Sequence, residues 1–95
     1  MKTDFIKRIE IDSDGRLLVA PSHLRLPFVY REAAEVSWDE NGAFLYSPTP
    51  RQWSYFEWFM HIMQVAKQLN CDLQIASTTI WVNVPDDLRR QIQPL

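Results

Sequence analysis

The fold of this 95-residue chain is decided by residues 49–70, TPRQWSYFEWFMHIMQVAKQLN. Thr49 precedes a proline, which disfavours helical geometry at Thr49 itself. We therefore expect Thr49 at the N-cap and Pro50 at the first helical position. Thr49 and Gln52 have the spacing of a capping box, and Asn70 suits a left-handed residue just beyond the helix. The stretch predicts one long helix of roughly 20 residues, about 30 Å in length.

The predicted helix has an unusually broad apolar side. Its apolar residues cover an arc of about 240°, whereas an ordinary surface helix has a stripe of about 100°. Either the sheet curls strongly around the helix, or part of the arc contacts a second chain. Trp53 and Trp58 lie on opposite margins, where we expect a rim or an interface. The arc consists of Trp53, Tyr55, Phe56, Trp58, Phe59, Met60, Ile62, Met63, Val65, Ala66 and Leu69.

The segment before the helix begins with a predicted hairpin. Residues 5–12 (FIKRIEID) and 16–20 (RLLVA) are typical of strands, and the loop between them ends in Gly15. A three-residue loop that ends in a left-handed glycine is a common hairpin connection. This loop pairs Ile9 with Val19, so the apolar side chains share one face.

A second hairpin is predicted next. Residues 28–39 indicate one long strand, with a bulge near Glu32. The alternative is a short helical turn at this point, because the run Arg-Glu-Ala-Ala favours a helix. The following loop again ends in a glycine, Gly42, and therefore pairs Trp38 with Phe44.

Two strands and a short helix are predicted after the central helix. Residues 72–76 and 79–84 indicate strands joined by a turn, and residues 86–93 indicate a helix. Residues 73–85 carry no charge, which is typical of a central strand or of an edge that a partner covers. The order β-β-β-β-α-β-β-α predicts an α+β domain over residues 1–95. In it, a curled antiparallel sheet of five to six strands packs on one long central helix.

The composition argues against several classes of protein. The net charge is −2, whereas general nucleic-acid binders carry a clustered basic surface. No apolar run has the length of a membrane span, and the charged start of the chain lacks a signal core. A single cysteine suits the reducing cytoplasm. We expect a cytoplasmic protein that binds neither nucleic acid nor membrane.

Five residues are candidates for binding a ligand or a partner: Arg31, Glu32, Trp53, Trp58 and Trp81. Glu32 shares the parity of its apolar neighbours, and an inward carboxylate must be paired, hydrated or functional. A bulge that turns Glu32 outward is the alternative. The three tryptophans flank the main faces of their elements, and tryptophan is enriched at interface hot spots.

Few residues in the sequence are candidates for a catalytic site or a metal site. Glu57 and His61 are one helical turn apart, and a carboxylate can orient an imidazole. A solvated pair explains the same spacing. Cys71 has no recognisable activating partner, which favours a small buried side chain. The two histidines lack the spacing of zinc ligands, and no glycine-rich phosphate loop exists. We expect no metal and no cofactor.

Three segments carry a resemblance to a known family. They are residues 14–19 (DGRLLV), 30–38 (YREAAEVSW) and 81–85 (WVNVP), followed by Leu88. Together they resemble small uncharacterised bacterial proteins carried on mobile integron gene cassettes. The chain is also similar in general character to toxin-immunity proteins of this size. The resemblance implies a compact, oligomeric α+β protein of bacterial origin with no assigned reaction.

These observations predict a non-enzymatic protein-interaction module that forms a homodimer or binds another protein. An immunity or antitoxin role is one concrete version. The alternative is a small-ligand binding protein with an aromatic pocket between sheet and helix, rimmed by Trp53 or Trp58 and reached by Arg31. A third interpretation is an enzyme that uses Glu57 and His61, or Glu32.

Overall fold

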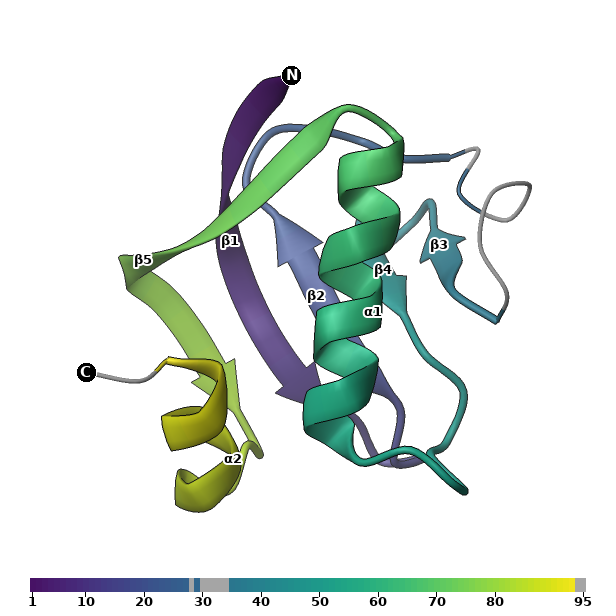
Figure 1. Cartoon of the computed structure of the whole chain (residues 1–95), viewed down its shortest axis with the longest axis vertical. Helices are drawn as coiled ribbons and strands as arrows, with labels where there is room; N and C mark the ends of the chain where they lie inside the picture. The colour runs from purple at the N-terminus through teal and green to yellow at the C-terminus, as the bar shows by residue number, and fades with distance from the viewer. Residues whose placement is uncertain (28, 30–34, 94–95) are drawn as a thin grey trace.

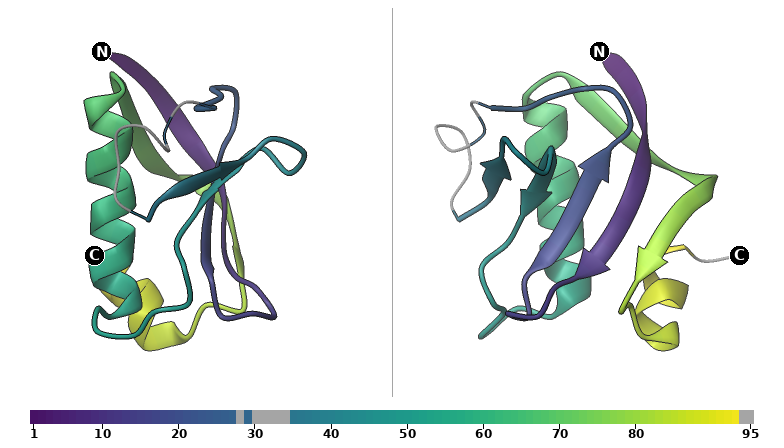
Figure 2. Two further views of the ribbon diagram at one scale, coloured as in Figure 1. Left: turned by 90° about the vertical axis from the view of Figure 1, so that its right-hand side faces the viewer. Right: turned by 180° about the vertical axis from the view of Figure 1, so that it is seen from behind.

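The computed structural model describes residues 1–27, 29 and 35–93. Within these residues, two helices lie on one face of a five-stranded sheet and leave the other face uncovered by helices (Figures 1 and 2). The α+β class is therefore confirmed. The elements are β1 (Lys2–Ile11), β2 (Leu17–Pro21), β3 (Ser37–Asp39), β4 (Phe44–Tyr46), α1 (Tyr55–Gln68), β5 (Cys71–Val82) and α2 (Asp86–Ile92).

The sheet is mixed, so the prediction of an entirely antiparallel sheet is wrong. The strand order is β3-β4-β2-β1-β5, and β5 runs parallel to β1. The other three pairings are antiparallel. Helix α1 causes the difference, because it carries the chain back along the sheet before β5 begins. Strands joined by such a helical crossover run in the same direction.

The first hairpin forms with the predicted register, and the second does not. Ile9 pairs with Val19, and Gly15 has the expected positive φ of 80°. In the second hairpin, Trp38 pairs with Leu45 instead of Phe44. The left-handed residue is Ala43, with a φ of 56°, so the loop is one residue longer than predicted. A one-residue shift in the pairing register moves side chains from the predicted face of the sheet to the opposite face.

The long strand predicted over residues 28–39 is confirmed only at β3. Val29 lies outside any strand, and its backbone N–H donates to the carbonyl of Leu26. Residues 28 and 30–34, which include the predicted bulge or helical turn, lie outside the described residues.

The chain after α1 forms one kinked strand instead of the predicted two strands joined by a reversing turn. Ile6 of β1 pairs with Ile75 and Arg8 pairs with Ile80, so Lys7 faces the segment 76–79 of β5. This segment is an irregular β-bulge with four residues opposite one, and it bends the strand without reversing it. The strand's bend is visible beside β1 in Figure 1.

The bulge is stabilised from within by Thr79, which is buried. The Thr79 hydroxyl accepts the backbone N–H of Ala76 at 2.9 Å and donates to the carbonyl of Ile6 at 2.7 Å. The bend also changes which side chains point inward. Ile80 is 54% exposed, whereas the next residue, Trp81, packs against the core.

Replacing Thr79 with valine removes both hydrogen bonds and nearly preserves the side-chain shape. We expect the free energy of unfolding to fall by about 1–3 kcal/mol, because a buried amide and a buried carbonyl lose their partner. Urea denaturation measures this change. Thr78→Val, at an exposed position of the same bulge, is the control and should change stability by no more than about 0.5 kcal/mol. Equal losses in the two variants would contradict the assignment.

Helix α1 begins later than predicted and is 14 residues long. Its N-cap is Ser54, and Ser54 and Glu57 form the capping box instead of Thr49 and Gln52. The Thr49 hydroxyl donates to the carbonyl of Asp14 at 2.7 Å. This bond ties the segment before the helix to the first hairpin loop and holds Thr49 there, five residues before the observed N-cap. The predicted helix of about 20 residues is therefore too long.

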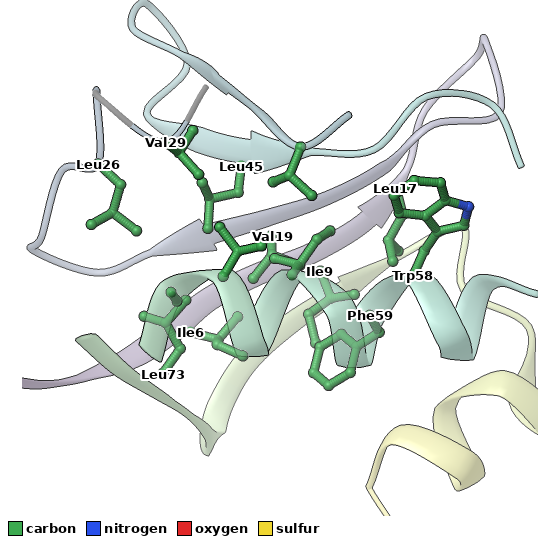
Figure 3. Packing of buried hydrophobic residues seen from close by; sticks show 14 of the residues in the cluster. Ile6, Ile9, Leu17, Val19, Leu26, Val29, Leu45, Trp58, Phe59 and Leu73 are labelled. Carbon is green, nitrogen blue, oxygen red and sulfur yellow. The ribbon is translucent and has the colours of Figure 1, made fainter. Parts of the chain in front are cut away.

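The core explains why the apolar arc of α1 is so broad. The side of α1 that faces the sheet packs against core side chains of β1, β2 and β5, and Figure 3 shows Trp58 and Phe59 of α1 within this cluster. Leu88 and Ile92 of α2 join the same core cluster, so α2 covers part of the arc that the sheet does not. Among the helical arc residues, Met60 stays largely exposed, at 52%. The buried residues of α1 are Trp58, Phe59, Ile62, Val65 and Ala66.

Removing the Ser54 hydroxyl tests where the helix begins. We expect Ser54→Ala to lower the free energy of unfolding by about 1 kcal/mol, because the N–H of Glu57 loses its acceptor. Circular dichroism during urea denaturation measures the loss. Ser13→Ala, in the exposed first loop, is the matched control and should be nearly neutral. A helix capped by Thr49 would instead leave Ser54→Ala neutral.

Candidate functional site

An open hollow lies beside the first turns of α1 and is called here the tryptophan hollow. Its volume is about 630 Å³, which falls within the range of small-molecule sites. The segment before the helix supplies one wall, and α1 supplies another. The lining residues are Glu35, Pro48, Thr49, Arg51, Gln52, Trp53, Trp58 and His61.

Three aromatic rings form the floor of the tryptophan hollow. The ring centroids of Trp53 and Trp58 are 4.8 Å apart, with the planes tilted by 51°. His61 meets both indoles edge-on, at 5.2 Å from Trp53 and 5.7 Å from Trp58. Trp58 and His61 are on α1, whereas Trp53 precedes the N-cap. The helix start at Ser54 therefore leaves Trp53 on a separate segment that folds back over the helix.

The two tryptophans differ in burial and in hydrogen bonding. Trp58 is only 6% exposed, whereas Trp53 is 43% exposed. Among the described residues, the buried indole N–H of Trp58 has no hydrogen-bond acceptor. Leaving such a donor unpaired costs about 1–3 kcal/mol. In Figure 3 the indole nitrogen of Trp58 points away from the other labelled core side chains.

Two side chains of opposite charge line the hollow. Glu35 and Arg51 are both exposed. Among residues 1–27, 29 and 35–93, neither takes part in an ion pair within 4.0 Å. Glu35 also has a φ of 66°. This conformation is uncommon for a residue other than glycine and is found more often at ligand-binding segments than elsewhere.

The structure describes three of the five predicted site residues and places them at two separate positions. Trp53 and Trp58 meet in the tryptophan hollow. Trp81 is on β5, where the Arg89 guanidinium lies 4.8 Å from its ring centroid. Arg31 and Glu32 lie outside the described residues.

Sequence reasoning missed Glu35, Arg51 and Gln52 as lining residues. The predicted helix included positions 51 and 52 and would have distributed them around its surface. A second capping box in the sequence, Ser54 with Glu57, indicates that the helix begins after residues 51 and 52. In the structure the Glu57 carboxylate accepts the N–H of Ser54 at 3.0 Å. The carboxylate that was a candidate partner for His61 therefore caps the helix.

Asp4 and Cys71 form a second cluster of titratable groups. Asp4 is 5% exposed, and its carboxylate accepts the backbone N–H groups of Phe5, His23 and Leu24 at 2.8–2.9 Å. Burial alone would raise the pKa of Asp4, but the hydrogen bonds from Leu24 and His23 outweigh burial, so the pKa lies below its ordinary value. Burial, and then the charge of Asp4, raise the pKa of the Cys71 thiol. The carboxylate therefore organises the loop after β2, and the thiol stays protonated at neutral pH.

Replacing Asp4 with asparagine should reduce stability in a pH-dependent way. Because the folded-state pKa is below the unfolded value of 3.8, the carboxylate adds stability that is complete above roughly pH 5. That stability disappears as the pH falls through the folded-state pKa. Urea denaturation between neutral and acidic pH should show a large loss for Asp4→Asn at pH 7 and a smaller one in acid. A difference from wild type that is independent of pH would contradict this account.

Within the described residues, no three histidine, cysteine, aspartate or glutamate side chains are grouped closely enough to hold a metal ion. Neither of the described helices has the length and apolar character needed to cross a membrane.

The fold and the hollow define a small α+β protein with both described helices on one face of a mixed sheet. The family model of Integron Cassette Protein Hfx_Cass5 matches residues 4–79. The chain therefore belongs to the Hfx_Cass5 family of integron cassette proteins, which confirms the resemblance seen in the sequence. The matched region includes Trp53 and Trp58 and ends before α2.

A solved structure supports the same assignment. It is described as an integron cassette protein, Hfx_Cass5, from the mobile metagenome of North West Arm Sewage Outfall. The two chains are 44% identical, and the alignment covers 97% of this chain and 93% of the other, with a TM-score of 0.52. Comparison with curated proteins found no match.

Proposed function

We propose that this protein is a non-enzymatic interaction module that pairs with a second copy of itself along β5. The observation that carries the proposal is the position of β5 at one edge of the sheet. In the part of the chain that the structure describes, β1 is its only neighbouring strand. The outward backbone N–H and C=O groups of β5 are therefore available to another strand.

The composition of β5 favours this use of the edge. Soluble proteins usually protect an exposed edge with charged side chains, prolines or a covering element. Residues 73–82 of β5 contain neither a charge nor a proline. On the strand itself Ile80 is 54% exposed, and on the adjacent β1 Phe5 is 51% exposed. An uncharged edge beside exposed apolar side chains is typical of a surface that a second chain covers when the protein functions.

The broad arc of α1, which first indicated a dimer, supports the proposal less than β5 does. The sheet and α2 together cover most of that arc. The proposed dimer interface is therefore the edge of the sheet at β5, and not the apolar arc of α1. A second copy can approach this edge antiparallel about a two-fold axis, so that both copies use the same surface.

The kink in β5 limits how the two edges meet. The segment 76–79 interrupts the regular edge, leaving one straight part before it and a shorter part after it. Bulges of this kind restrict indiscriminate edge pairing. The pairing is therefore expected along one of the two straight parts, in a single register. A cytoplasmic location fits this proposal because Cys71 needs no disulfide partner.

Solution mass tests the proposal. Light scattering across a micromolar dilution series should give twice the mass of the chain. Gln74→Lys and Ile80→Lys each place a charge at an exposed position of one straight part of β5. Like charges brought together across the two-fold axis are unfavourable, so at least one variant should raise the dissociation constant about tenfold or more.

Gln64→Lys, on the exposed side of α1, is the matched control and should leave the dimer unchanged. A monomeric wild-type protein would refute self-association. That result would leave β5 available to a different protein, as an immunity or antitoxin role requires. A dimer that neither β5 variant weakens would place the interface elsewhere.

A further inference from the structure

We propose that the tryptophan hollow binds a small zwitterion with an aromatic ring, of the class of free aromatic amino acids. This inference is independent of pairing along β5, because the hollow and the strand share no residues. Three features of the hollow carry it: its opposite charges, its exposed indole, and an indole N–H that has no acceptor within residues 1–27, 29 and 35–93.

The opposite charges determine the class of ligand. Arg51 presents a guanidinium, which binds a carboxylate with two parallel hydrogen bonds. Glu35 presents a carboxylate, which suits an ammonium group. Both line the same hollow, and neither forms an ion pair among the described residues. A ligand that carries one charge alone would satisfy one of these side chains and leave the other unmatched.

The aromatic floor provides the surface for a ring. Trp53 is 43% exposed, so its indole offers apolar area from the side that Trp58 does not contact. Aromatic rings favour offset or edge-to-face contact with centroids about 4.5–7 Å apart. The hollow's volume of about 630 Å³ exceeds that of a single amino acid, which leaves room for such a contact and for water.

The Trp58 N–H supplies a polar anchor that its present surroundings do not use. Among the described residues this buried N–H has no acceptor, and the ring centroid of Trp53 lies 4.8 Å from that of the same indole. Trp53 precedes the N-cap, so its ring can shift without disturbing the backbone hydrogen bonds of α1. A shift of this kind exposes the N–H to a carboxylate oxygen of the ligand. Binding then pairs a donor that has no acceptor in the part of the chain that the structure describes.

Calorimetric titration with three related compounds tests the proposal. L-Phenylalanine carries both charges, phenethylamine lacks the carboxylate, and 3-phenylpropionate lacks the ammonium. L-Phenylalanine should bind at least about tenfold more tightly than either analogue, since each loses one charged hydrogen-bonded contact. It should also raise the unfolding temperature, because a ligand that binds only the folded state stabilises it.

Two neutral variants assign the charges. Arg51→Gln should weaken L-phenylalanine and 3-phenylpropionate by about tenfold and leave phenethylamine unchanged. Glu35→Gln should weaken L-phenylalanine and phenethylamine and leave 3-phenylpropionate unchanged. Arg90→Gln, exposed on α2, is the control and should bind all three as wild type does.

Two outcomes would overturn the proposal. One is the absence of both heat and thermal stabilisation with millimolar L-phenylalanine. The other is equal affinity for the three compounds, which would show apolar contact without recognition of the charges. Neither outcome depends on whether the protein dimerises, because the same titration can be made with a β5 variant.

Discussion

The parallel pairing of β5 with β1 is the constraint on which the rest of the structure depends. It joins Lys2 to Cys71 at one end and Glu10 to Val82 at the other, so the strand after α1 must return alongside the first strand of the chain. This return places α1 across the sheet and puts α2 beside it on the same face (Figure 2). The same pairing leaves the far side of β5 as a sheet edge.

The position at which α1 begins has a separate cause and a different consequence. Ser54 caps the helix, while Thr49 and the hydroxyl of Tyr55 are held by carbonyls of the first hairpin loop. The residues between Thr49 and Ser54 are therefore free to form a wall instead of another helical turn. That wall brings Arg51 and Trp53 beside α1, and the tryptophan hollow exists for this reason.

Local signals predicted the local features well. Gly15 identified the first hairpin with its register, and the short helix predicted over residues 86–93 is α2. The predictions were wrong where contacts between residues distant in the sequence select one of two locally similar structures. Two capping boxes lie five residues apart, and only the contact of Thr49 with a distant loop selects the second. Likewise, Thr79 turns a predicted reversal into a kink by bonding to Ile6, which lies at the opposite end of the chain. The periodic pattern of apolar residues in the sequence predicts neither the Thr49 contact nor the Thr79 contact.

The β1–β5 pairing also governs the order in which the molecule can assemble. The first hairpin needs only neighbouring residues, whereas β5 must close a loop of about 70 residues onto β1, and such long-range closure is slow. During synthesis, the second side of β1 has no strand to pair with until residues 71–82 have left the ribosome. A chain that ends before that point leaves one side of β1 unpaired, although β1 lies between β2 and β5 in the finished sheet. The last third of this protein thus completes a structure begun by its first ten residues.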